Sequence, residues 1–161
     1  MLWNNVICNQ SVKDQLVSMV ENNKLSHALL LVGKEGTAAL PLALAFAQYL
    51  VSIPAPVAAV DDLFGPAPAA SETPSFIHPA DIATHPASAS AFSRASQLLH
   101  PDLHITVPTI TRKTGEKPVS SQFMAEFRSF VQQQPYGNVY QWLQFIKAEN
   151  KQGNITAEEC N

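Results

Sequence analysis

The sequence predicts an α/β fold in which helices cover a parallel β-sheet. Three features lead to this prediction: five consecutive apolar residues at 28–32, a glycine-containing turn at 33–37, and an Ala- and Leu-rich stretch at 40–50. A short apolar run that a glycine ends is typical of a strand buried on both faces of a parallel sheet. A strand, a turn, a helix and a later strand follow the order of a βαβ unit.

The first block, residues 1–50, is expected to contain a helix, a strand, a phosphate-loop-like turn and a second helix. Ser11 and Asp14 form a weak helix-start pattern, apolar residues follow at helical spacing, and two asparagines end the helix. The strand is predicted at 28–32. The second helix is predicted at 40–50, where Pro41 is acceptable only within the first turn.

The second block, residues 51–95, has the composition of a flexible insertion. It contains seven of the twelve prolines, twelve alanines and many Ser and Thr residues, and shows neither a helical nor an alternating period. Such a segment buries too little apolar surface to offset the entropy lost on ordering.

The third block, residues 96–161, is predicted to continue the α/β domain with one strand and two helices. Residues 103–107 alternate between apolar and polar, as in a half-buried strand. Phenylalanines at helical spacing mark one face of a helix that stops before Pro135. Asn138 and Gln141 have the spacing of a capping box at the start of the second helix.

Composition and charge argue against several classes of function. The chain has 161 residues with a formal net charge of −3, and it lacks the clustered Lys and Arg of a nucleic-acid-binding surface. No apolar run approaches the ~20 residues that span a bilayer, and no signal peptide begins the chain. Cys8 and Cys160 are isolated, which predicts a reduced, cytoplasmic protein, and the lack of a long apolar run predicts no membrane association.

The turn after the predicted strand resembles a phosphate loop that has lost its chemistry. A working loop reads G-x-x-x-x-G-K-[ST]. Aligned on Gly33, this pattern places Ala38 at the second glycine, Ala39 at the lysine and Leu40 at the hydroxyl residue. Ala39 supplies no positive charge to a triphosphate, and Leu40 cannot hold magnesium. Pro41 also lacks the N–H that would point toward a phosphate.

The candidate site is therefore a degenerate phosphate loop in which no catalytic residue is predicted. Lys34 follows the first glycine directly, so it does not replace the missing lysine. ATP binding and hydrolysis are not expected. The loop comprises Gly33, Lys34, Glu35, Gly36, Thr37, Ala38, Ala39 and Leu40.

Several short motifs on both flanks of the insertion together resemble one family. They are Val12-Lys13-Asp14-Gln15-Leu16, Lys24-Leu25-Ser26-His27-Ala28, His100-Pro101-Asp102 and Glu149-Asn150-Lys151-Gln152-Gly153. As a set they resemble the delta-prime subunit of the clamp loader of bacterial DNA polymerase III, in the form found in Bacteroidetes-like bacteria. The resemblance covers about 115 of the 161 residues and fails in the middle.

The resemblance implies the front part of an AAA+ domain, a three-layer αβα fold with a parallel sheet, that ends before the Walker B strand. It also implies a non-catalytic subunit in the heteropentamer that loads the sliding clamp during DNA replication. The expected partners are the ATPase subunits and delta, with the clamp and primed DNA contacted indirectly. The chain would belong to the polymerase III holoenzyme without ATPase activity of its own.

No metal site is predicted. Relatives in that family often carry four zinc-binding cysteines, but the corresponding positions here hold residues such as Pro86, Ala89 and Phe92. Zinc needs four N or S donors, so that zinc site is lost. His100 and His104 would lie ~13 Å apart along a strand, too far to share a metal ion.

Two alternatives to a clamp-loader role stay open from the sequence. The first is a degenerate ATP-binding protein or ATPase, which rests only on the strand, turn and helix order. The second is a non-functional truncated fragment, which the long insertion and the early end of the chain suggest.

Overall fold

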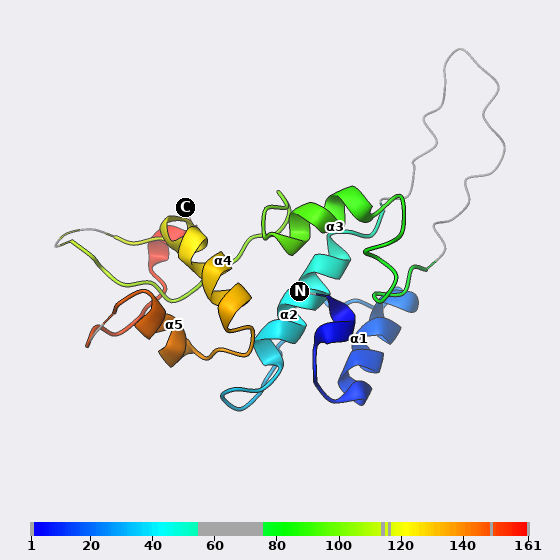
Figure 1. The fold of residues 1–161 in the computed structure, drawn as a ribbon, viewed down its shortest axis with the longest axis horizontal. Helices are drawn as coiled ribbons and strands as arrows, with labels where there is room; N and C mark the ends of the chain where they lie inside the picture. The colour runs from blue at the N-terminus through cyan, green and yellow to red at the C-terminus, as the bar shows by residue number, and fades with distance from the viewer. Residues whose placement is uncertain (1, 55–75, 114, 116, 149, 161) are drawn as a thin grey trace, which may run out of the picture.

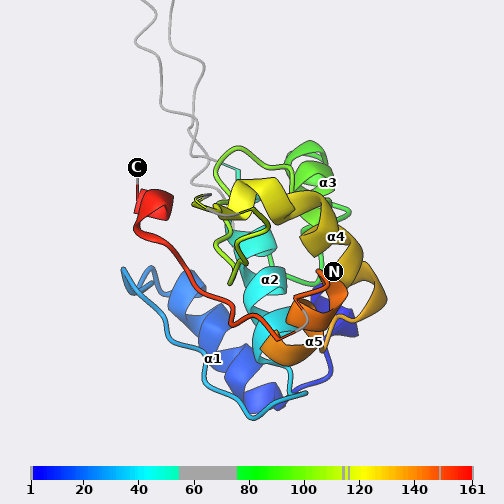
Figure 2. The ribbon, with the colours of Figure 1, turned by 90° about the vertical axis from the view of Figure 1, so that its left-hand side faces the viewer.

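The computed structural model describes residues 2–54, 76–113, 115, 117–148 and 150–160, and these form a helical structure (Figure 1, Figure 2). The α-helices are α1 (Gln10–Glu21), α2 (Ala39–Leu50), α3 (Ala89–Ser96), α4 (Met124–Gln133) and α5 (Val139–Phe145). The 3-10 helices are η1 (Trp3–Asn5), η2 (Ser120–Phe123) and η3 (Ala157–Cys160).

The predicted parallel sheet, and with it the AAA+ αβα architecture, is wrong. The described ranges contain no β-strand. One isolated antiparallel bridge joins Thr109 and Asn154, whose backbones exchange hydrogen bonds of 2.8 and 3.0 Å. The segments 28–32 and 103–107, both predicted as strands, run outside any helix or ladder.

The two segments form no strands because neither has a second strand to pair with among the described residues. A β-ladder needs a neighbouring strand about 4.7–4.9 Å away. Leu30 and Val32 are 87% and 83% exposed, so the first segment is not the buried centre of a sheet. In the second segment a side chain takes the place of a ladder. The Ser120 hydroxyl accepts the Val107 N–H at 2.9 Å and donates to the Val107 carbonyl at 3.2 Å.

Helix α2 lies between α1 on one side and α4 and α5 on the other (Figure 1), and it contributes side chains to two apolar clusters. On one side Leu44 joins a cluster formed by η2, α4, α5 and the 107–110 segment. On the other side Phe46 and Tyr49 join a cluster formed by η1, α1 and α3. A helix that is apolar on nearly all sides must be covered on nearly all sides, which explains the Ala- and Leu-rich sequence of α2.

The predicted helices are confirmed, with one change of cap. Helix α1 follows Asn9, whose side chain accepts the Ser11 N–H at 3.0 Å, so Asn9 rather than Ser11 caps it. Pro41 lies in the first turn of α2. Helix α4 ends before Pro135, and α5 has the capping box formed by Asn138 and Gln141.

The predicted insertion divides into two parts. Residues 55–75 lie outside the described residues. Residues 76–95 fold against the core, because Ile82 is 1% exposed and Phe92 of α3 is 9% exposed. The prediction of an unstructured segment is wrong for this second part. Few large apolar residues anchor it, and their spacing gives too weak a period to be noticed in the sequence.

Tyr49 ties this second part to α2. Its hydroxyl donates to the Ile77 carbonyl at 2.8 Å, and the residue is 1% exposed. Burial, and secondarily the charge of Glu21, raises the pKa of Tyr49 to about 12. The folded state therefore holds the proton more tightly than the unfolded state, whose tyrosine has a pKa of about 10. The resulting stabilisation is complete below pH 10 and is lost as the pH rises toward 12.

We expect Tyr49→Phe to cost roughly 1 kcal/mol at neutral pH through the lost hydrogen bond. The variant should also flatten the fall in the free energy of unfolding between pH 10 and 12, which in the parent amounts to roughly 2–3 kcal/mol. Urea unfolding at several alkaline pH values measures both effects. An equally steep fall in the variant would contradict the assignment to Tyr49.

Candidate functional site

The candidate phosphate loop folds as a tight turn closed on itself. The Lys34 carbonyl accepts both the Thr37 N–H at 3.1 Å and the Thr37 hydroxyl at 2.6 Å. Gly36 has φ of +73°, a conformation that favours glycine. A Cβ at Gly33 would overlap the Thr37 hydroxyl. Both glycines and the threonine hydroxyl therefore serve the shape of the turn.

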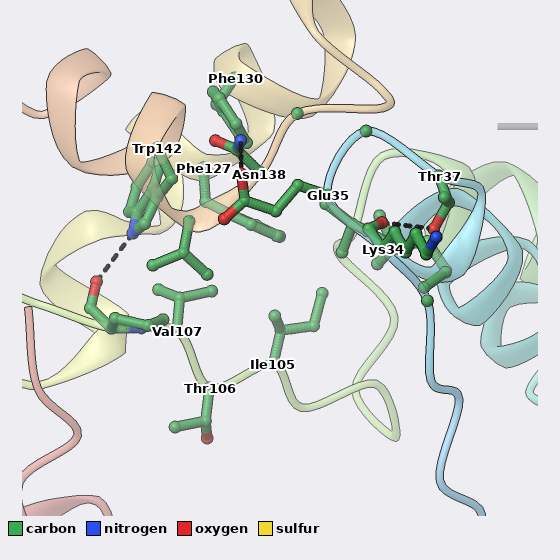
Figure 3. Close-up of a pocket in the computed structure, with 18 residues that line it drawn as sticks. Lys34, Glu35, Thr37, Ile105, Thr106, Val107, Phe127, Phe130, Asn138 and Trp142 are labelled. Carbon is green, nitrogen blue, oxygen red and sulfur yellow. Dashed lines mark hydrogen bonds between the residues drawn. The ribbon is translucent and has the colours of Figure 1, made fainter.

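The Glu35 carboxylate lies between this turn and the start of α5. Glu35 accepts a hydrogen bond from the Asn138 side-chain amide at 3.2 Å, which joins the turn to the start of α5 (Figure 3). A fixed negative charge beside the turn repels a phosphate rather than attracting it. This contact joins residues 103 positions apart, and no sequence pattern indicated it.

The positions of the second glycine and of the hydroxyl residue in the phosphate-loop pattern are used for packing. Residues 33–37 are exposed, whereas Ala38, Ala39 and Leu40 are half-buried. Leu40 packs against the cluster on the α4–α5 side of α2, and Ala38 packs against the cluster on the α1 side. No side chain caps the start of α2, and no acidic residue lies in its first turn. The turn thus anchors a helix between two cores.

An apolar cavity of about 390 Å³ lies beside the turn. In Figure 3, Ile105 and Val107 point into it from one side, Phe127 and Trp142 face them, and Thr106 points away. The Phe127 and Trp142 rings meet edge to face, with centroids 5.5 Å apart. The alternation that predicted a strand at 103–107 here directs side chains into a cavity.

The polar groups at this cavity are few. The Trp142 indole N–H donates to the Pro108 carbonyl at 2.7 Å, which fixes the ring against the 105–108 segment. Lys34, Glu35 and Asn138 also line the cavity, where the turn meets α5. Apolar walls with a few polar groups suit an uncharged, apolar group better than a triphosphate.

Asn138 lies at the junction of the turn and α5. Its side chain accepts the Gln141 N–H at 2.8 Å, and its own N–H donates to the Gln141 side chain at 3.0 Å. We expect Asn138→Ala to cost about 1 kcal/mol, as loss of an N-cap typically does. Asn138→Ser should keep the cap and lose only the bond to Glu35.

Chemical denaturation of the parent and of both Asn138 variants measures this prediction. The alanine variant should lose clearly more free energy of unfolding than the serine variant. Equal losses in the two would show that the cap does not stabilise α5.

The described residues contain no group of three or more His, Cys, Asp or Glu side chains placed to hold a metal ion. Ala89 is exposed and Phe92 is buried. His100 Nδ1 instead accepts the Asp102 N–H at 3.2 Å within a turn.

Among the helices described, none combines the length and apolarity required to cross a bilayer. Comparisons of the chain with protein-family models, with curated proteins and with solved structures found no match.

Proposed function

We propose that this chain is a non-catalytic, protein-binding subunit of a clamp loader, of the delta-prime type that its sequence motifs resemble. In this role it binds the ATPase subunits and delta in the cytoplasm. It contacts the sliding clamp and primed DNA only through those subunits. The proposal rests on the motifs around the insertion and on the chemistry of the turn at 33–40.

The turn at 33–40 supports the proposal that the chain has no ATPase activity. A phosphate loop needs an ammonium group for the β and γ phosphates and a hydroxyl for magnesium. Here Ala39 and Leu40 stand at those positions, and Glu35 adds a carboxylate held by Asn138 at 3.2 Å. The turn joins a helix to two cores, and Ala39 offers a triphosphate no positive charge at the position of the loop lysine.

The segment 28–32 supports the proposal that the chain binds another protein. Its sequence, Ala-Leu-Leu-Leu-Val, strongly favours a strand, yet Leu30 is 87% exposed and Val32 is 83% exposed. Residues 25–33 form no backbone–backbone hydrogen bond with other described residues. Unpaired backbone beside exposed apolar side chains is the surface to which an extended strand of another protein adds. We assign that strand to a neighbouring clamp-loader subunit.

Co-purification tests the proposal. The tagged full-length chain is expressed together with the ATPase subunits and delta of its own organism, and the complex is isolated by affinity and size-exclusion chromatography. We expect the chain to elute with the other subunits in a fixed ratio. If the ATPase subunits and delta assemble with each other while this chain elutes alone, the proposal is wrong.

A further inference from the structure

A second cavity, distinct from the one beside the turn, lies between α2, the end of α3 and α4. Its volume is about 370 Å³. Unlike the first cavity it has many polar side chains and no Asp or Glu among its lining residues. The polar side chains are those of Asn5, Gln48, Ser96, Gln97, Arg128, Gln132 and Tyr136.

Arg128 is the charged group in this wall. Its Nε is buried and has no hydrogen-bond partner among the described residues. Its Nη2 reaches the Leu98 carbonyl at 3.5 Å, which is long for a hydrogen bond between nitrogen and oxygen. Arg128 as a whole is half-buried, and its buried Nε has lost hydration that no described residue replaces, which is costly for a charged group. The cavity lining supplies no negative charge to this guanidinium group.

Neutral donors lie around the same space. The Tyr136 hydroxyl accepts the Ile7 N–H at 2.8 Å, so its own proton is available to a ligand. The side-chain amides of Asn5 and Gln132 form no hydrogen bond within the described part of the chain, and each can donate two. Gln132 follows Arg128 by four residues on α4, which places both side chains on one helix face.

We propose that this cavity binds an oxyanion, a carboxylate or a phosphate group, through the guanidinium fork of Arg128, with Tyr136 and the two amides as neutral donors. Arginine matches such groups because its N–H donors pair with two oxygens at once. The absence of acidic lining residues leaves that fork without a competing anion from the cavity wall.

The test uses the full chain labelled with ¹⁵N, in which the Arg128 Nε–H signal is followed as inorganic phosphate or acetate is added at constant ionic strength. We expect a saturable shift with a dissociation constant on the order of 1 mM. Arg128→Gln should weaken binding at least about tenfold, judged from the shifts of neighbouring backbone amides. Arg94→Gln, which removes an exposed arginine from α3, should leave the affinity unchanged.

Gln132→Glu keeps Arg128 and tests the proposal independently, in case Arg128→Gln does not fold. The new carboxylate should pair with the guanidinium group, abolish the shift with added anion and raise the melting temperature. Saturation with phosphate alone identifies a phosphate site, and saturation with acetate identifies a carboxylate site. The proposal fails if neither anion gives a saturable shift. It also fails if Arg128→Gln or Gln132→Glu binds as tightly as the parent.

Discussion

Replacing Trp142 with alanine is expected to remove about 3–5 kcal/mol from the free energy of unfolding, as loss of a large aromatic core side chain does. Trp142 is 3% exposed and lies between Phe127 and Phe130, with ring centroids 5.5 Å from each. Its indole N–H also donates to the Pro108 carbonyl at 2.7 Å. A loss of this size is a large part of the stability of a small domain, so we expect the variant to be extensively unfolded at 37 °C.

Trp142→Phe is the matched control, because it keeps an aromatic ring and removes the N–H. We expect it to lose roughly 1–2 kcal/mol, mainly through the unpaired Pro108 carbonyl and the smaller ring. Urea unfolding followed by far-UV circular dichroism gives both free energies. In both variants the fluorescence of Trp3 still reports on the cluster around α1. A loss below about 1 kcal/mol for Trp142→Ala would show that the aromatic cluster is not packed.

The second large effect concerns binding rather than stability. If a partner subunit adds a strand to the segment 28–32 as proposed, we expect Leu30→Lys to weaken its binding at least about a hundredfold, because the ammonium group would be buried among apolar side chains. Leu30 is 87% exposed in the isolated chain, so the free energy of unfolding should change by no more than about 0.5 kcal/mol. A binding titration with the purified partner subunit measures the affinity.

Tyr140→Lys provides the control for that experiment. Tyr140 is 67% exposed on α5, outside the segment 28–32, and its replacement should leave the affinity unchanged. If Leu30→Lys binds as tightly as the parent, the partner does not add to the segment 28–32. If both variants bind weakly, the interaction surface extends to α5.

The positions of α1, α2, α4 and α5 followed from local patterns in the sequence, whereas α3 lies in a segment predicted to be unstructured. The Asn138–Gln141 capping box, the stop before Pro135 and the apolar stretch of α2 each depend on neighbouring residues alone. The lack of a sheet in the described part of the chain could not be predicted from local patterns in the same way. A strand exists only with a partner, and the apolar run at 28–32 specifies a tendency to pair but supplies no second strand.

The loss of the phosphate-binding lysine in the turn at 33–40 could also be predicted from the sequence, because it depends only on which residue stands at position 39. The two cavities could not be predicted from the sequence. The contact between Glu35 and Asn138 spans 103 residues, and the unpartnered Nε of Arg128 depends on which groups the fold brings near it. Both are consequences of tertiary packing, for which the sequence contains no local signal.

Equilibrium titration of the purified chain with fluorescently labelled ATP and magnesium tests the central claim most directly, since it asks whether the turn at 33–40 holds a triphosphate. With no ammonium group at Ala39 and no hydroxyl at Leu40, we expect no saturable binding at submillimolar ATP and no hydrolysis. Submillimolar binding that disappears in Gly36→Val would contradict the claim and establish a working nucleotide site in this turn.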